Sequence, residues 1–100
     1  MRAIFVGASP LTVMTVQRLL KAGHDVVIID TDEDKISGLS ETLDCGFIHG
    51  DGSRPAVLEE LSPDETDMLF CLSNDDQDNI IASLVGQTMQ FSSVVTKIED

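Results

Sequence analysis

The chain has 100 residues, 42% of them hydrophobic, and its 18 acidic and 6 basic side chains give a formal net charge of −12. This length suits one domain with its own core, and with neither a bilayer-length apolar run nor a signal peptide we expect that domain to be soluble and intracellular. The excess of negative charge argues against non-specific binding to nucleic acid or to an anionic membrane surface and favours cations and basic partners.

The first part of the chain predicts a strand, a tight turn and a helix. Residues 2–6 are a short apolar run, and after the turn Gly7-Ala8-Ser9-Pro10 apolar residues recur at helical spacing from Leu11 to Lys21. Ser9 is a suitable N-cap, Pro10 suits the first helical position, and Gly23 can end the helix in a left-handed conformation. We therefore expect the strand to feed directly into the helix through this turn.

A second apolar run, residues 26–29, ends at Asp30. A strand, a glycine-containing turn, a helix and a second strand with an acid at its tip, about twenty residues past the turn, are typical of the mononucleotide-binding half of a Rossmann fold. We therefore expect an α/β fold with a Rossmann-like, doubly wound parallel sheet.

The next segment predicts a second helix and a third strand. A capping-box pair, Thr31 and Asp34, precedes a helix that extends to Leu43. Residues 45–49 form the strand, which ends in the glycine-rich loop 50–53. This loop should lie at the carboxyl edge of the sheet, where open α/β sheets bind their ligands.

The second half of the chain continues the alternation of strands and helices. A short helix over residues 54–61 is followed by the uninterrupted apolar run 68–72, which is typical of a central parallel strand covered on both faces. Residues 73–76 cap a fourth helix, and residues 91–98 form a fifth strand. We expect five strands in the order 3-2-1-4-5 within three α/β/α layers.

Two further groups of side chains bear on packing. Cys45 and Cys71 fall in predicted strands that this order keeps apart, so we expect both to be reduced core residues. The fourth predicted helix carries an apolar face that serves either the core or an association surface, and its members are Ile81, Leu84, Val85 and Met89.

Four features in this order resemble the potassium-transport nucleotide-binding family, also called RCK or TrkA-N domains. They are the opening strand with Gly7, the run 23–30, the loop 50–52, and Asp75-Asp76 followed by Asn79. The resemblance spans essentially the whole chain and implies one cytoplasmic, non-enzymatic regulatory domain, residues 1–100, of a potassium channel or uptake transporter. It also implies assembly into dimers, often stacked into rings, beside a membrane-embedded partner. Because a doubly wound half normally adds a helix and a sixth strand, we expect the chain to be truncated at its C-terminus.

The resemblance implies that an adenine nucleotide, either NAD/NADH or AMP/ADP/ATP, binds at the carboxyl edge of the sheet. The first loop then takes the phosphates, Asp30 takes the ribose hydroxyls, and Asp51 with Gly52 lies beside the adenine. Ser73 lines the floor of the pocket. From their positions in the chain, Lys35 and Arg54 are the bases expected near this edge, where they can contact phosphate or adenine. The site residues implied in this way are Gly7, Ala8, Ser9, Leu11, Thr12, Asp30, Thr31, Lys35, Asp51, Gly52 and Ser73.

The glycine fingerprint of the first loop departs from the usual G-x-G-x-x-G, because its three positions are Gly7, Ser9 and Thr12. Side chains at the second and third positions hinder the approach to pyrophosphate and the packing of helix on strand. Pro10 also lacks an N–H group that a helix N-terminus would direct at an anion. We therefore favour one phosphate over two, with the Ser9 hydroxyl as a compensating donor, and the acid at Asp30 disfavours NADP.

Several alternatives stay open. Asp30 contacts ribose or only ends a buried strand, Asp51 contacts adenine or only caps the short helix, and Asn79 orients the preceding loop or is polar surface. The acidic clusters at 30–34 and 75–78 are explained by helix N-termini, so we expect no metal there. In place of a sensor, the chain could be the N-terminal half of an NAD-dependent oxidoreductase or epimerase, or a dimerisation module without a ligand.

Overall fold

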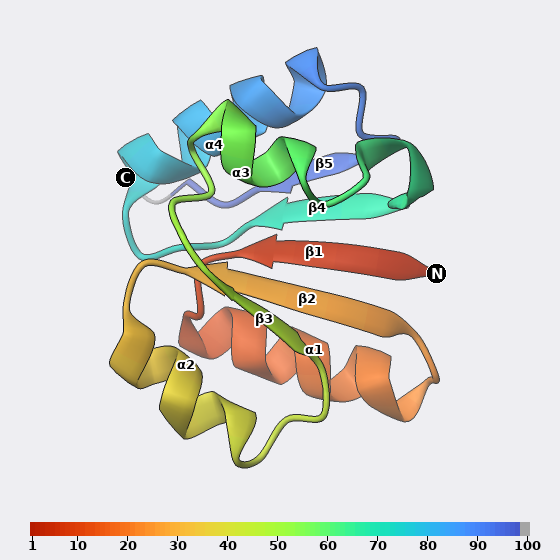
Figure 1. Cartoon of the computed structure of the whole chain (residues 1–100), viewed down its shortest axis with the longest axis vertical. Coiled ribbons are helices and arrows are strands. Elements are labelled where there is room, and N and C mark those ends of the chain that lie inside the picture. The colour runs from red at the N-terminus through yellow and green to blue at the C-terminus, as the bar shows by residue number, and fades with distance from the viewer. Residues whose placement is uncertain (99–100) are drawn as a thin grey trace.

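Five strands form one parallel sheet in the order β3-β2-β1-β4-β5 in the computed structural model, which describes residues 1–98 (Figure 1). The doubly wound order predicted from the sequence is confirmed. The strands are β1 (Arg2–Val6), β2 (Asp25–Asp30), β3 (Gly46–His49), β4 (Met68–Cys71) and β5 (Val94–Thr96). The helices are α1 (Pro10–Lys21), α2 (Glu33–Ser40), α3 (Pro55–Glu59) and α4 (Asp76–Thr88), with the 3-10 turn η1 (Pro63–Glu65) before β4.

The helices cover both faces of the sheet, α1 and α2 on one side and α3 and α4 on the other (Figure 1). Successive residues of β1 therefore enter different cores. Ile4 packs in a cluster with Leu58 of α3 and Ala82 of α4, whereas its neighbour Phe5 packs in a second cluster with Val16 of α1. Burial on both faces explains why the central strands are continuous apolar runs without polar alternation.

The ends of α1 follow the sequence prediction. The Ser9 side chain accepts a hydrogen bond from the Thr12 amide at 3.2 Å, and Pro10 begins the helix. Gly23 has a φ of 84° just after the last helical turn, in the left-handed region that glycine adopts at little cost. Together these signals fix the helix between the two strands that it connects.

Several predicted boundaries are wrong, among them that of the short helix predicted over 54–61, which covers only Pro55–Glu59. The N-cap of α2 is Asp32, whose side chain accepts from the amides of Asp34 and Lys35, and not Thr31. That helix ends at Ser40, and the side chain of Leu43 enters the core from the following turn. The fifth strand covers only Val94–Thr96 of the predicted 91–98, because Phe91 fills the core before the strand begins.

The buried face of α4 is built from small residues. Asn79, Ala82 and Gly86 are the buried positions, and a Cβ atom on Gly86 would overlap the side chain of Leu69 in β4. This close approach of helix to sheet turns the larger side chains outward. Ile81 is 47% exposed and Leu84 is 59% exposed, so of the two alternatives left open for this face the core does not apply to these two side chains. Val85 and Met89 do pack against the core from the side.

Both cysteines are free thiols, as predicted, and they lie on opposite faces of the sheet. Cys71 is fully buried in the core beneath α3 and α4, and burial raises its pKa to about 11. Cys45 is partly buried beside the other core, and burial followed by repulsion from Asp44 raises its pKa as well. Within residues 1–98, no helix is both long enough and apolar enough to cross a bilayer.

Candidate functional site

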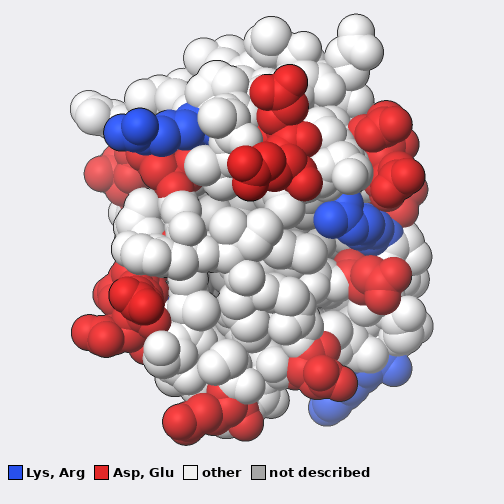
Figure 2. Space-filling model, viewed as in Figure 1, with Lys and Arg blue, Asp and Glu red and all other residues white. Residues whose placement is uncertain are grey.

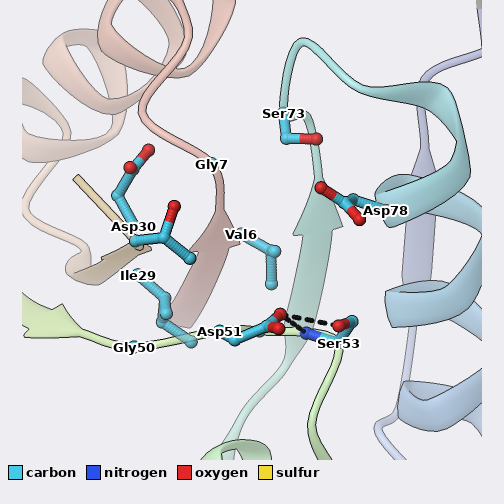
Figure 3. Close-up of a pocket in the computed structure, with 11 residues that line it drawn as sticks. Val6, Gly7, Ile29, Asp30, Gly50, Asp51, Ser53, Ser73 and Asp78 are labelled. Atoms are coloured by element: carbon cyan, nitrogen blue, oxygen red, sulfur yellow. Dashed lines mark hydrogen bonds between the residues drawn. The ribbon is translucent and has the colours of Figure 1, made fainter.

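Two adjoining hollows lie at the carboxyl edge of the sheet, where β1, β2, β3 and β4 end. The Asp51 hollow, about 60 Å³, is lined by the tips of β1 and β2, the loop after β3, Ser73 and Asp78 (Figure 3). The Ala8 hollow, about 270 Å³, lies between the first loop and residues 73–78 and also includes Lys35. Both hollows share five lining residues, namely Gly7, Asp30, Thr31, Ser73 and Asp78.

Gly7 holds the loops after β1 and β4 against each other. Its φ of 99° is strained for any residue with a side chain, and a Cβ atom built on it would overlap the backbone of Ser73. Its amide donates to the carbonyl of Ile29 at 2.8 Å. The first fingerprint glycine is therefore required both by its dihedral angle and by its neighbour.

Asp30 ties the first loop to the tip of β2. One carboxylate oxygen accepts from the Ala8 amide at 2.7 Å, and the other accepts from the Asp32 amide at 2.8 Å. Asp30 is therefore more than the polar end of a buried strand, since it fixes the position of the loop opposite. Each carboxylate oxygen has about two lone-pair sites, so the group keeps acceptor capacity for the hydroxyls of a ligand.

Ser9 and Thr12, which replace the second and third fingerprint glycines, point into the turn. The Thr12 hydroxyl donates to the carbonyl of Gly7 at 2.5 Å, and the Ser9 hydroxyl lies 3.3 Å from the Thr12 hydroxyl. Both residues are at most 2% exposed. The Ser9 hydroxyl is thus engaged inside the loop, contrary to the expectation that it donates to a phosphate.

Only two amides at the start of α1 remain open. The amides of Gly7, Ala8, Thr12 and Val13 all have partners, and Pro10 has no N–H. Among the described residues, nothing accepts from the amides of Ser9 and Leu11. The Leu11 side chain is 39% exposed and lines neither hollow, so only its backbone can serve the site.

Asp51 belongs to a tight turn and not to a helix cap. The carboxylate of Asp51 accepts hydrogen bonds from the Ser53 amide at 2.9 Å and from the Ser53 hydroxyl at 2.6 Å. These two bonds lower the pKa of Asp51, and the bond from the hydroxyl has the larger effect. Arg54 lies 3.7 Å away, lines neither hollow and is itself the N-cap of α3. The alternative that Asp51 caps this helix is wrong. Gly52 brings the turn onto β1, because a Cβ atom there would overlap Val6.

Asn79 orients the loop that carries Ser73, as one of the two sequence interpretations held. It is fully buried, and its Oδ1 accepts from the amide and the hydroxyl of Ser73, each at 2.8 Å. Its Nδ2 donates to the carbonyls of Ser73 at 3.0 Å and Lys97 at 3.1 Å. The loop after β4 is therefore fixed to both α4 and the end of β5.

Nine of the eleven predicted site residues line the hollows, and Leu11 and Thr12 do not. Among the described lining residues outside that prediction, Asp78 is the one that lines both hollows (Figure 3). A signal was present, because Asp78 stands three residues after Asp75, on the first turn of the helix that follows β4. Residues at such a position lie at the carboxyl edge.

Acidic side chains dominate the lining of the site. Lys35 is the one Lys or Arg among the described residues of the two hollows, and the four carboxylates there are Asp30, Asp51, Asp75 and Asp78. Desolvation, then repulsion from Asp75 and Asp51, raises the pKa of Asp78. Acids also outnumber bases on the molecular face seen in Figure 2. Within residues 1–98, no three His, Cys, Asp or Glu side chains come together in a way that could hold a metal ion.

Sequence comparison decides the family. The model of the TrkA-N domain matches residues 3–100. The chain belongs to the TrkA-N domain family. Among curated relatives, it is 33% identical over 89 residues to the Trk system potassium uptake protein TrkA of Halomonas elongata, covering 89% of this chain and 20% of the relative. It is 30% identical over 98 residues to the protein of the same name from Azorhizobium caulinodans, covering 98% of this chain and 21% of the relative. This TrkA-N domain thus spans about a fifth of the length of those relatives.

Solved structures share the fold of this TrkA-N domain. The NAD(P)-binding domain of an exopolyphosphatase-related protein from Archaeoglobus fulgidus has a TM-score of 0.89 at 17% identity, covering 98% of this chain and 73% of that one. The GsuK channel bound to NAD has a TM-score of 0.83 at 18% identity, with 93% of this chain and 17% of that one covered. At these identities the similarity concerns the fold.

Proposed function

We propose that this TrkA-N domain binds an adenine nucleotide at the carboxyl edge of its sheet and acts as the nucleotide-sensing part of a potassium uptake protein. The observation that carries the proposal is the bond from the Ala8 amide to the Asp30 carboxylate, which sets the phosphate loop and the ribose acceptor side by side. Both residues line the Ala8 hollow. A built loop of this kind, at the edge where open α/β sheets bind ligands, favours binding over a purely structural turn.

The nucleotide is proposed to lie across the two hollows. One phosphate sits against the open amides of Ser9 and Leu11 at the start of α1, where the helix dipole also favours an anion. The ribose hydroxyls donate to the remaining acceptor sites of Asp30, with Thr31 beside it. The adenine lies toward Asp51 and Gly52, and Lys35 provides the cationic contact for the phosphate.

The partner is proposed to be a membrane-embedded potassium transporter or channel, with this domain on the cytoplasmic side. The name of the relatives, Trk system potassium uptake protein TrkA, and the family match support this assignment. Nucleotides with different phosphate content would favour different arrangements of the loops and of paired domains, and they can do so only by binding those arrangements unequally. A sensing role needs no catalytic group.

An enzymatic role, as the first half of an NAD-dependent oxidoreductase or epimerase, finds less support. Such chemistry needs a group that moves a proton next to the nicotinamide. The chain has no tyrosine, and the family match and the names of the curated relatives support a role in potassium uptake instead. We therefore propose a non-enzymatic domain.

Pairing of domains is proposed to use the outer face of α4. Ile80, Ile81 and Leu84 are 40%, 47% and 59% exposed on this helix. Three large apolar side chains on one helix face are costly in water and gain from burial against a second copy. Because α4 packs on the sheet through small residues, its large apolar side chains remain available for association with a second copy.

Thermal unfolding tests the nucleotide proposal directly. AMP, ADP, ATP, NAD and NADH are added singly to the purified chain, and a ligand at about 100 times its Kd should stabilise by about 2.7 kcal/mol, a shift of several degrees. Asp30→Asn should remove the shift. Asp25→Asn is the matched control, because it removes the same charge from the opposite end of β2. The proposal fails if no nucleotide shifts the midpoint, or if both variants lose the shift equally.

A further inference from the structure

The four carboxylates around the two hollows differ in how far they are already compensated. Asp30 accepts from two backbone amides, and Asp75 accepts from the amides of Gln77 and Asp78 at the start of α4. Asp51 accepts two bonds from Ser53 and lies near Arg54. Each of these three charges is therefore spread over donors that the fold supplies.

Asp78 is different. Among residues 1–98, its carboxylate has no hydrogen-bond or ion-pair partner, although it lines both hollows and lies across them from Gly7 and Asp51 (Figure 3). Desolvation, followed by repulsion from Asp75 and Asp51, also raises the pKa of Asp78.

The positive features of the site are few. Lys35 is the one Lys or Arg that lines the described hollows, and the open amides at the start of α1 belong to Ser9 and Leu11. These groups suffice for one phosphate. Any further phosphate placed in the hollows would meet the uncompensated charge of Asp78 without another cation to offset it.

We infer that Asp78 is a specificity-determining residue that selects adenine nucleotides with a single phosphate and disfavours those with two or three. The inference rests on the proposed nucleotide site and deepens it, because it names the ligand class that this site accepts. A terminal phosphate carries about −1.5 to −2 charges near neutral pH, and each phosphate added behind it brings one more. Affinity therefore falls from AMP to ADP to ATP.

Titration calorimetry on the purified chain tests this order. AMP, ADP and ATP are compared at low ionic strength in buffer with EDTA, so that no divalent cation masks the charge of the ligand. The wild-type chain should bind AMP most tightly. In Asp78→Asn, the dissociation constant for ATP divided by that for AMP should be about two- to five-fold smaller than in the wild-type chain, which is the range expected for one exposed charge pair. Asp78→Glu keeps the charge and should keep the wild-type ratio.

Asp76→Asn is the matched control, because Asp76 lies on the same helical turn but lines neither hollow. It removes the same net charge and should leave the ratio unchanged. The inference is overturned if ATP binds as tightly as AMP to the wild-type chain, if Asp78→Asn leaves the ratio unchanged, or if Asp76→Asn changes it equally. Failure of every nucleotide to bind both the wild-type chain and Asp78→Asn would instead refute the proposed function itself.

Discussion

Gly7→Ala should destabilise the chain far more than the same change at Gly23. Both glycines have positive φ angles, 99° and 84°. Alanine in a left-handed conformation costs about 1–2 kcal/mol, and this penalty applies at either position. At Gly23 nothing lies within 4 Å of the added Cβ, whereas at Gly7 it would overlap the backbone of Ser73, which is held by Asn79 and cannot move freely. Overpacking adds about 1–3 kcal/mol.

The expected losses are therefore about 1–2 kcal/mol for Gly23→Ala and about 2–5 kcal/mol for Gly7→Ala. Urea denaturation followed by circular dichroism measures both free energies of unfolding, and a domain of this size has about 5–15 kcal/mol in total. Gly7→Ala should also abolish any nucleotide-induced thermal shift, while Gly23→Ala keeps it. Equal destabilisation by the two variants would refute the claim that Gly7 is required by its contact with Ser73.

Three further outcomes are expected. Asn79→Leu should cost about 2–4 kcal/mol in urea denaturation, because the part-buried amide and carbonyl of Ser73 lose their partners; a loss below about 1 kcal/mol would contradict the role of this network. Cys71 has a folded pKa of about 11 against an ordinary value of 9, so the unfolded state releases its proton first and stability should fall as pH rises from 9 to 11. Cys71→Ala should lower stability at neutral pH yet flatten that decline, and equal alkaline slopes for the two proteins would contradict the assignment. Leu84→Glu should leave the free energy of unfolding within about 1 kcal/mol of the wild-type value, since the side chain is 59% exposed. If α4 pairs two copies, the same variant should halve the molecular mass measured by light scattering. A variant that is still a dimer would exclude this face as the pairing surface.

The strand order could be predicted because its signals are local. Each apolar run is bounded by a turn or a cap, and parallel strands joined by helices leave few possible topologies. The cap of α2 was misplaced because Thr31 and Asp32 are both good N-cap residues, and the choice depends on Asp30, whose carboxylate accepts from the Asp32 amide. The N-cap preferences of single residues do not predict this hydrogen bond between Asp30 and Asp32.

The burial of α4 could not be predicted for a different reason. A count of apolar residues favours Ile81 and Leu84 for the core, yet the helix packs through Ala82 and Gly86. The orientation of α4 depends on how closely the helix approaches the sheet. The approach is close because Gly86 has no side chain where it faces Leu69.

The first loop shows that folding of the turn and capacity for phosphate are separate properties. Thr12 occupies the third fingerprint position without opening the turn, because its hydroxyl returns to the carbonyl of Gly7, and Ser9 caps the helix from the second position. The turn therefore keeps its shape without two of its three glycines. The same substitutions consume the Thr12 amide, and Pro10 removes another, so fewer donors face the ligand. A fingerprint altered in this way preserves the fold, and under the proposed function we expect it to reduce the number of phosphates that the loop can hold.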